Sequence, residues 1–517
     1  MRALMSATAQ KEALPLGPGV PKQRNVGEHP LALYVLFFTE MWERFSYYGM
    51  RALLVYYMTK HILLPEWHHK VLGHAAIMGA LTKVFGVMDL DQQSSQIYGL
   101  YTAFVYLTPL LGGMIADRWI GQRKSVYVGG IIMAFAQFVL TNERLFYVGL
   151  LLLIIGNGFF KPNISTQVGA LYPQGDQRRD RAFMIFYVGI NVGALLSPLV
   201  CGTLGEKVGW GWGFGSAGVG MILGLVVYSF GQRILAPDNV MKKKEATEDG
   251  AAKKPVEKKP FTKDEWGRII GLCVLCALNI VFWGVYEQQG NTLAKWTDEN
   301  TDRFLGGWQW PGSWLQAVNP AIIFLFTPVM IEIWKRQAKK GKEPSSVAKM
   351  AIGCFVLGFG YALMALGAKV SGGVNASVLW LVGATFLLTI GELYLSPIGL
   401  SLVTKVSPPR VVSMMMGMWF ISSFVGNYLA GYIGTYWTQM GKPSFFLLLT
   451  GLAFLSGVMM LAVMVPLKKA LGDENAVRDD GTGPAEATTA DEDEHATVTK
   501  SGVPPKKTDA EAATDAA

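Results

Sequence analysis

An apolar stretch from about residue 31 to residue 57 carries four formal charges, and this combination constrains the fold more than any other feature of the sequence. A stretch of this length crosses a bilayer as one helix. Its charged side chains and one tyrosine fall on a single stripe at helical spacing: Glu40, Glu43, Arg44, Tyr47 and Arg51. A charge inside a membrane is costly unless it is paired or hydrated, so we expect this stripe to line a polar cavity between helices. For Glu40 and Arg44, an i,i+4 pair, a purely structural lock between helices is an equal alternative.

The composition indicates an all-α integral membrane protein. Of the 517 residues, 51% are hydrophobic, only 16% are charged and 59 are glycine. The formal charge of +8 does not indicate nucleic-acid binding, because the basic residues lie in short connections between apolar segments. The four cysteines lie within or beside apolar segments, and we interpret them as core residues and not as metal ligands: Cys201, Cys273, Cys276 and Cys354.

About twelve segments are long enough to span a bilayer. They are residues 31–60, 95–117, 124–142, 145–171, 182–204, 212–235, 267–290, 314–335, 347–369, 376–405, 410–438 and 444–467. An even number of spans places both ends of the chain on one side. Lys and Arg concentrate in alternate connections, so the positive-inside rule predicts that both termini are cytoplasmic. The connection from Leu63 to Gln96 is partly amphipathic between Val71 and Met88, and we expect a surface helix there.

The spans divide into two halves of six. We expect a disordered tail at residues 1–28, a first bundle at 29–235, a charged linker at 236–266, a second bundle at 267–467 and a disordered tail at 468–517. The segment from Ile155 to Pro162 matches the segment from Ile390 to Pro397 without gaps. Two such parallel repeats predict a twelve-helix fold of two six-helix bundles, related by a pseudo-two-fold axis, with the substrate bound at their interface.

Polar residues at membrane depth in both halves suit a small zwitterionic substrate. Arg51 and Lys161 can hold a carboxylate, and Glu392 can hold an ammonium group. The amides of Asn191 and Asn319 can bond the N–H and C=O groups of a peptide. Five aromatic residues can line apolar subpockets, although each alone is more often a core or membrane-interface residue: Tyr47, Tyr48, Tyr106, Trp283 and Trp419.

The energy source that the sequence predicts is a proton gradient. No phosphate-binding loop motif of an ATPase occurs. None of the six histidines falls at mid-depth, so we expect protons to bind to carboxylates, whose neutral form is favoured by burial. Glu43 and Glu287 are the first candidates, followed by Glu392. An ionised Glu287 can pair with Arg51, and its protonation would release Arg51 for the substrate carboxylate. We expect no cofactor beyond the proton as coupling ion.

Three motifs stand out along the chain. The first is Glu40-x-x-Glu43-Arg44-Phe45-x-Tyr47-Tyr48 in the first span. The second is Phe-Tyr-Val-Gly-Ile-Asn-Val-Gly at residues 186–193, and the third runs from Gly113 to Lys124. Together they resemble the proton-dependent oligopeptide transporter family of the major facilitator superfamily. They are similar to the family's first-helix signature, its fifth-helix signature and the superfamily's loop between helices two and three, and the resemblance covers about residues 31–467.

This resemblance implies proton-driven import of di- and tripeptides by alternating access, which we place in a bacterial inner membrane. It implies an outer gate formed by Arg51 with Glu287 and an inner gate formed by Lys161 with Glu392. The substrate contacts that it implies are Tyr47, Tyr48, Tyr106, Asn191, Asn319, Ser396 and Trp419. To these the chemistry of the residues adds Arg51, Lys161, Trp283 and Glu392. The predicted proton-coupling groups are Glu40, Glu43, Arg44, Glu287 and Glu392.

The chain departs from the family pattern at two places outside the cavity. The interval from Pro237 to Trp266 is too polar for the two extra helices that bacterial members usually carry. The connection from Ala368 to Ser377 is too short for the large domain of animal members, whose helix-two histidine is also lacking. These departures leave the lineage open and argue against coupling through histidine.

The main alternative is a facilitator of the same scaffold for another substrate, such as nitrate or an amino acid. A simple anion would not need an ammonium acceptor at Glu392, which favours a peptide. A membrane-embedded enzyme is disfavoured because no His-Glu-x-x-His motif and no intramembrane aspartate pair occurs. A receptor or scaffold would not explain charges in both halves. The predicted partners are peptides, protons and the lipid bilayer, and a monomer is compatible with the sequence.

Overall fold

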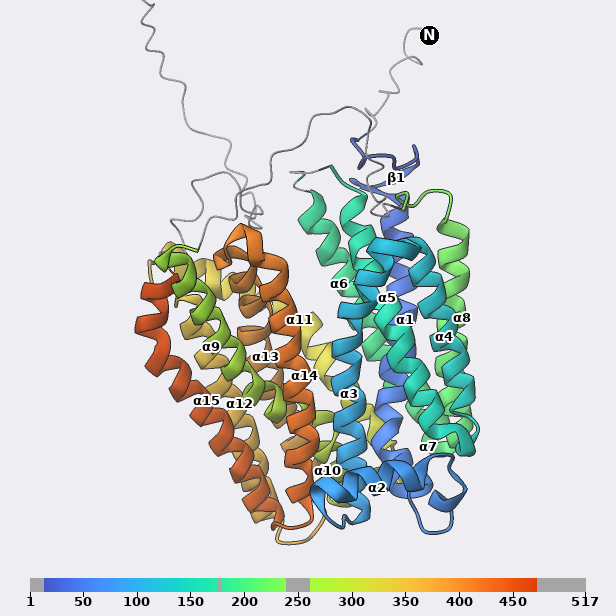
Figure 1. Ribbon diagram of the computed structural model, residues 1–517. Coiled ribbons are helices and arrows are strands. Elements are labelled where there is room, and N and C mark those ends of the chain that lie inside the picture. Colours follow the sequence, from blue (N-terminus) through green and yellow to red (C-terminus); the bar gives the residue numbers. More distant parts are fainter. Residues whose placement is uncertain (1–13, 174–175, 177, 239–260, 472–517) are drawn as a thin grey trace, which may run out of the picture. The chain divides into compact units, whose positions relative to one another are not determined.

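The computed structural model describes residues 14–173, 176, 178–238 and 261–471, and twelve long α-helices dominate these residues (Figure 1). The first half contains α1 (Leu31–Tyr57), α3 (Leu90–Ile115), α4 (Gln122–Val139), α5 (Phe146–Ala170), α6 (Arg178–Ser197) and α8 (Trp210–Gly231). The second half contains α9 (Lys263–Tyr286), α11 (Val318–Lys339), α12 (Ser346–Val370), α13 (Val378–Val406), α14 (Val412–Gly434) and α15 (Lys442–Leu471). Nine helical segments in this described part are long and apolar enough to cross a membrane on length and composition alone.

Short elements connect or extend these helices. Three π-helical turns continue α1, α3 and α6: η1 (Met58–Ile62), η3 (Ala116–Ile120) and η5 (Pro198–Gly202). Three short helices are α2 (His74–Phe85), α7 (Thr203–Lys207) and α10 (Thr292–Glu299). The 3-10 turns are η2 (His68–Lys70), η4 (Glu143–Leu145), η6 (Glu287–Gly290), η7 (Gly312–Ala317), η8 (Pro409–Val411) and η9 (Thr435–Trp437). Two antiparallel pairs are β1 (Asn25–Val26) with β2 (His29–Pro30), and β3 (Phe304–Leu305) with β4 (Trp308–Gln309). The predicted surface helix between residues 71 and 88 is confirmed as α2.

The start of α3 differs from the prediction. The helix begins at Leu90 and not at residue 95, because Asp89 forms a capping box with Gln92. The Asp89 carboxylate accepts a hydrogen bond from the Gln92 backbone N–H at 2.8 Å, and the Gln92 side chain accepts one from the Asp89 N–H at 3.0 Å. The Gln92 amide also donates to the carbonyl of Thr435 at 3.2 Å. The polar residues that suggested a loop are therefore helical residues that face the second half.

The predicted disorder of residues 1–28 is wrong for residues 14–28, which pack against the first half. The Gly17 N–H donates to the Leu171 carbonyl at 2.9 Å, and the Gln23 side chain donates to the Ile234 carbonyl at 2.9 Å. The β1–β2 pairing satisfies further backbone groups just before α1. Hydrogen bonding to exposed helix ends thus orders a segment with little apolar content. Residues 1–13, most of the predicted linker (239–260) and residues 472–517 of the second tail lie outside the described residues.

The two halves use the same helix pairings. Counted within each half, the first helix packs on the fifth and sixth, the second on the fourth, and the third on the fourth and sixth. These pairs are α1 with α6 and α8, α3 with α5, and α4 with α5 and α8, against α9 with α14 and α15, α11 with α13, and α12 with α13 and α15. Between halves, α3 packs on α14 and α6 packs on α11, so each second helix meets the fifth helix of the other half. This reciprocal pattern is the one that a pseudo-two-fold axis produces, as predicted.

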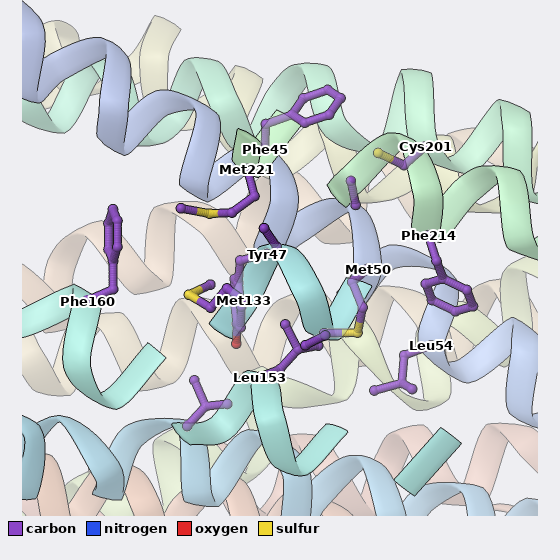
Figure 2. Packing of buried hydrophobic residues seen from close by; sticks show 14 of the residues in the cluster. Phe45, Tyr47, Met50, Leu54, Met133, Leu153, Phe160, Cys201, Phe214 and Met221 are labelled. Carbon is purple, nitrogen blue, oxygen red and sulfur yellow. The ribbon is translucent and has the colours of Figure 1, made fainter. Parts of the chain in front are cut away.

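Each half also has its own apolar core. In the first half the core residues lie between Ala32 and Ala236, joined by Ala294 alone from the second half. In the second half they lie between Ile269 and Met460. Figure 2 shows ten labelled side chains of the first core, which come from α1, α4, α5, η5 and α8. Because lipid is as apolar as these side chains, close packing must hold each bundle together. Because each bundle has its own apolar core, the interface between the bundles can carry polar residues.

Gly99 lies where α3 crosses α14, and we expect Gly99→Ala to destabilise the protein. A Cβ at this position would lie 2.5 Å from the Cα of Gly431 and 2.8 Å from its nitrogen, so one helix backbone must move away from the other. The expected cost is about 1–3 kcal/mol, measured as a lower Tm of the purified protein. Gly79→Ala on α2 is the matched control, since a Cβ there has no neighbour within 4 Å. An equal Tm for both variants would contradict this account of the crossing.

Candidate functional site

The polar contacts between the two bundles gather at one end of the molecule. Hydrogen bonds and ion pairs between the bundles follow one pattern among the described residues. The partner in the first bundle always lies in residues 51–98 or 203–207, and the partner in the second bundle lies in residues 287–316 or 435–438. We call these four segments the closed end. It is the end at which α1 finishes and α3 begins. One predicted substrate residue, Arg51, belongs to the closed end.

Arg51 and Glu287 form the predicted outer pair across the bundles. The guanidinium on α1 is ion-paired with the Glu287 carboxylate on η6, and both side chains are largely buried. Tyr98 on α3, which is fully buried, accepts hydrogen bonds from Arg51 Nε at 3.0 Å and from Nη2 at 2.8 Å. Gly290 makes room for this hydroxyl, since a Cβ there would lie 2.0 Å from the tyrosine oxygen. Three helical segments from two bundles therefore meet at one guanidinium.

Lys295 is a second buried cation at the closed end. It lies on α10 and is only 2% exposed. Its Nζ is 2.7 Å from the backbone carbonyl and 3.2 Å from the carboxylate of Asp91, and 3.0 Å from the hydroxyl of Ser95. That hydroxyl donates in turn to the Asn291 side chain at 3.1 Å. The start of α3 is thus tied to the segment that follows α9.

A third group of charges covers the closed end nearer its surface. Asp298 accepts from Lys60 at 2.5 Å and from Arg303 at 2.7 Å. Arg303 also lies 3.6 Å from Glu206, whose carboxylate accepts from the backbone N–H groups of Gly312 and Ser313 at 2.9 Å each. The chain of alternating charges runs from α1 through the connection after α10 to α7. It links both bundles through side chains that are more exposed than Lys295.

The charge cluster of α1 is buried, as predicted for a stripe that avoids lipid. Glu40, Glu43 and Arg44 are each at most 4% exposed. Arg44 Nε lies 2.9 Å from Glu40, and Arg44 is also ion-paired with Glu43. Two carboxylates face one guanidinium, so the cluster has a surplus of negative charge when both are ionised.

The predicted inner pair is not formed in this structure. Lys161 is half-buried, and its Nζ lies 4.6 Å from the centroid of the Tyr106 ring on α3. A cation over a ring face is attracted by the ring's negative charge density, but this contact is weaker than a buried ion pair. No ion pair joins Lys161 to Glu392 among the described residues. Lys161 and Glu392 therefore have different partners, each within its own bundle.

Glu392 has its partners within the second bundle. The Tyr286 hydroxyl donates to Glu392 Oε2. The Asn319 amide lies 3.3 Å from the same oxygen, 3.0 Å from the Tyr286 hydroxyl and 2.9 Å from the hydroxyl of Thr389. No hydrogen bond reaches Oε1 from the part of the chain that the structure describes. The carboxylate is thus held by one oxygen and has the other available.

The remaining predicted contacts lie on five helices: α1, α6, α9, α13 and α14. Tyr47 is buried and its ring lies edge-on to that of half-buried Tyr48, with centroids 5.2 Å apart. The Asn191 amide nitrogen is bonded to the carbonyl of Tyr187 in its own helix at 2.9 Å, so its oxygen is the group left for a ligand. Buried Trp283 has no partner for its indole N–H among the described residues. The two further residues are half-buried Ser396 on α13 and buried Trp419 on α14.

Sequence reasoning missed the tyrosines and the closed-end charges. Tyr98, Tyr286 and Thr389 each bond a predicted residue, yet an isolated hydroxyl in an apolar span gives no pattern. Lys295 and Arg303 lie in a polar connection that resembles an ordinary loop. Charge balance could have predicted Lys295 and Arg303. The acidic residues Asp91, Asp298 and Glu206 each require a cation at the same depth in the membrane.

An apolar cavity lies away from these groups. It has a volume of about 600 Å³ and lies among α1, α6 and α8, where its walls include Met41, Trp42 and Trp212. Its lining is almost wholly apolar, so it offers a zwitterion nothing to bind. The charged residues around Arg51, Lys161 and Glu392 are the candidate site.

Two six-helix bundles with a charged interface define a multi-pass membrane transporter of the major facilitator type. The sequence profile described as PTR2, POT family, matches residues 123–249 and 237–445. The chain is 32% identical over 479 residues to Peptide transporter YePEPT of Yersinia enterocolitica, which covers 80% of this chain and 89% of that protein. It is 31% identical over 502 residues to a Di-/tripeptide transporter of Lactococcus lactis subsp. cremoris, which covers 86% and 97%.

The fold agrees with these matches. A crystal structure of a mutant of peptide transporter POT in complex with alafosfalin superposes with a TM-score of 0.76 at 30% identity, over 87% of this chain and 98% of that chain. The chain therefore belongs to the POT family, which is a family of transporters and not of enzymes. The predicted family and the twelve-helix fold are confirmed.

We expect Lys295→Met to destabilise the protein far more than Lys60→Met. Lys295 is buried, and its removal would leave the Asp91 carboxylate without its cation, which costs about 3 kcal/mol for a largely buried pair. The side chain of Lys60 is 37% exposed, and without it Asp298 would still pair with Arg303. The expected loss of stability in Lys60→Met is therefore about 0.2–1 kcal/mol. Thermal unfolding of the two purified variants measures the difference. Equal Tm values would show that the buried lysine does not hold the closed end together.

Proposed function

We propose that this protein imports di- and tripeptides together with protons by alternating access. Two relatives at 31–32% identity are named as peptide transporters, and the solved structure of similar fold carries the peptide-like ligand alafosfalin. The observation that carries the proposal is the separation of charge at the interface. Arg51 and Lys161 present cations from the first bundle, and Glu392 presents a carboxylate with an available oxygen from the second. A peptide with two charged ends matches both sides at once.

Nitrate and other simple anions fit this arrangement less well. They would pair with Arg51 or Lys161 and leave Glu392 facing a like charge. A single amino acid has both charges, but it lacks the peptide group that the amides of Asn191 and Asn319 can bond. The oxygen of Asn191 and the amide of Asn319 lie on helices of different bundles. A short peptide that spans the interface uses all of these groups.

The same carboxylates supply a route for proton coupling. Glu43 lacks an exposed surface and shares Arg44 with Glu40, so protonation of one carboxylate leaves a balanced pair with the other. A proton on Glu287 frees Arg51 from its only carboxylate partner among the described residues. The predicted coupling groups Glu40, Glu43, Arg44, Glu287 and Glu392 are each placed to exchange a partner when a proton or a peptide arrives.

We further propose that the protein lies in a bacterial inner membrane with both termini in the cytoplasm. The basic connections before α4 and after α11 support this orientation through the positive-inside rule. The closed end then faces outward, and the conformation described here is the inward-facing one. Arg51 with Glu287 acts as the outer gate, and Lys161 with Glu392 forms the inner gate in the opposite conformation.

The direct test is uptake of labelled dialanine into proteoliposomes. With an inside-alkaline gradient we expect accumulation above the external concentration, and without it only equilibration. Unlabelled dipeptides should compete for uptake, whereas nitrate should not. Competition by nitrate but not by dipeptides would make the chain an anion facilitator, and accumulation that ignores the gradient would remove the proton from the mechanism.

We expect Glu43→Gln to abolish gradient-driven accumulation while it preserves exchange of peptide across the membrane. The amide keeps the shape of the side chain but cannot take up a proton, so the two bundles can still alternate with peptide bound. Counterflow of labelled dialanine against internal unlabelled dialanine measures this exchange. Glu332→Gln is the control, because this glutamate is 53% exposed and its ion-pair partner, Arg336, lies on its own helix. Undiminished accumulation by the Glu43 variant would exclude this residue from coupling.

A further inference from the structure

Tyr286 belongs to none of the motifs, yet it occupies the most specific position at the acidic side of the site. We propose that Tyr286 is a positioning residue that holds Glu392 ready for the ammonium group of the substrate. The inference rests on the proposed function and names the group that selects substrates with a free amino terminus. It acts through Glu392 and does not itself contact the reacting proton or the substrate.

Two helices of the second bundle bring donors to one oxygen of Glu392, which itself lies on α13. The hydroxyl of Tyr286 at the end of α9 donates to Oε2, and the amide of Asn319 on α11 lies 3.3 Å from it. Asn319 also donates to the Tyr286 hydroxyl at 3.0 Å, so this hydroxyl has both an acceptor and a donor. The direction of its hydrogen is thereby set toward the carboxylate. Oε1 of the half-buried Glu392 is left as the atom that can accept an N–H from a ligand.

The ring of Tyr286 is fixed, which makes its hydroxyl a reliable anchor. The side chain is 8% exposed. The ring of Phe282 stacks on it with centroids 5.7 Å apart and an angle of 11° between planes, and the Trp283 ring meets it edge-on at 5.5 Å. A side chain packed on two aromatic neighbours loses little further freedom when it bonds a carboxylate. The Glu392 side chain, in contrast, has three torsions of its own and needs such an anchor.

This anchor also reduces the competition from Lys161. A carboxylate without hydrogen-bond donors would be driven toward the cation of the other bundle, and the inner pair would form whether or not substrate is present. With donors from Tyr286 and Asn319, the charge of Glu392 is already partly stabilised. In this structure Lys161 lies against Tyr106 and has no ion pair with Glu392 among the described residues. The site stays available for an ammonium group.

The test compares two competitors of labelled dialanine uptake in the Tyr286→Phe variant. Dialanine has a free ammonium group, and N-acetyl-dialanine has the same peptide body without it. We expect the inhibition constant of dialanine to rise about tenfold, because a hydrogen bond to a charged group is lost. The constant of N-acetyl-dialanine should change less than about twofold, since it makes no use of a positioned carboxylate. The ratio of the two constants is the readout that a loss of packing alone would not move.

Tyr361→Phe is the matched control. The Tyr361 hydroxyl is buried and donates to the backbone carbonyl of Val285 at 2.9 Å, directly before Tyr286. Its removal costs a buried hydrogen bond in the same region without touching Glu392. Both inhibition constants should stay within about twofold of their original values in this variant. Calorimetric binding of dialanine and N-acetyl-dialanine to the purified variants gives the same ratio if transport is too slow to follow.

Two results would overturn the inference. An equal rise of both constants in Tyr286→Phe would mean that the hydroxyl only supports packing, and an unchanged dialanine constant would mean that it does not position Glu392. Failure of the proposed function is distinct from these results. In that case the unsubstituted protein itself would neither bind nor take up dialanine.

Discussion

Buried charge governs this structure, because each ionised group between the bundles must have a partner that lipid cannot supply. Arg51 has Glu287 from the other bundle, Lys295 has Asp91, and Arg44 has Glu40 and Glu43. Separating the bundles at the closed end breaks the cross-bundle pairs, and an unpaired buried charge costs several kcal/mol. In the proposed mechanism, protons or a ligand replace the lost partners when the closed end opens. Conformational change and ligand exchange are for this reason one process.

The fold is symmetric, but the charges placed on it are not. Both bundles pair their helices in the same way, and both contain a proline within the fourth helix, at Pro162 in α5 and at Pro397 in α13. Near these prolines the first bundle carries Lys161 and the second carries Glu392. A symmetric scaffold allows the two bundles to rock about their interface. In the proposed mechanism these opposite charges give the site a direction, because the carboxylate of a peptide binds toward one bundle and its ammonium group toward the other.

The sequence predicted the parts that follow from periodicity and from lipid thickness. Twelve spans, the two halves and the pairing of Arg51 with Glu287 could all be inferred because a long apolar run and an intramembrane charge have few alternatives. Residues 14–28 were mispredicted because their order depends on helix ends far away in the sequence, such as Leu171 and Ile234. The partners of Glu392 were missed for a similar reason. Tyr286 and Asn319 reach it from helices whose rotation no single-sequence pattern reports.

Tyr286 and Glu287 are consecutive residues, and this adjacency ties the substrate site to the closed end. Tyr286 ends α9 and holds Glu392 within the second bundle, whereas Glu287 begins η6 and reaches across to Arg51. One peptide bond thus joins the residue that anchors the ammonium acceptor to the residue that pairs with the outer cation. The planar peptide between them keeps their Cα atoms at a fixed separation. A movement of this segment as a unit would therefore change the contact with Arg51 and the position of the Tyr286 hydroxyl together.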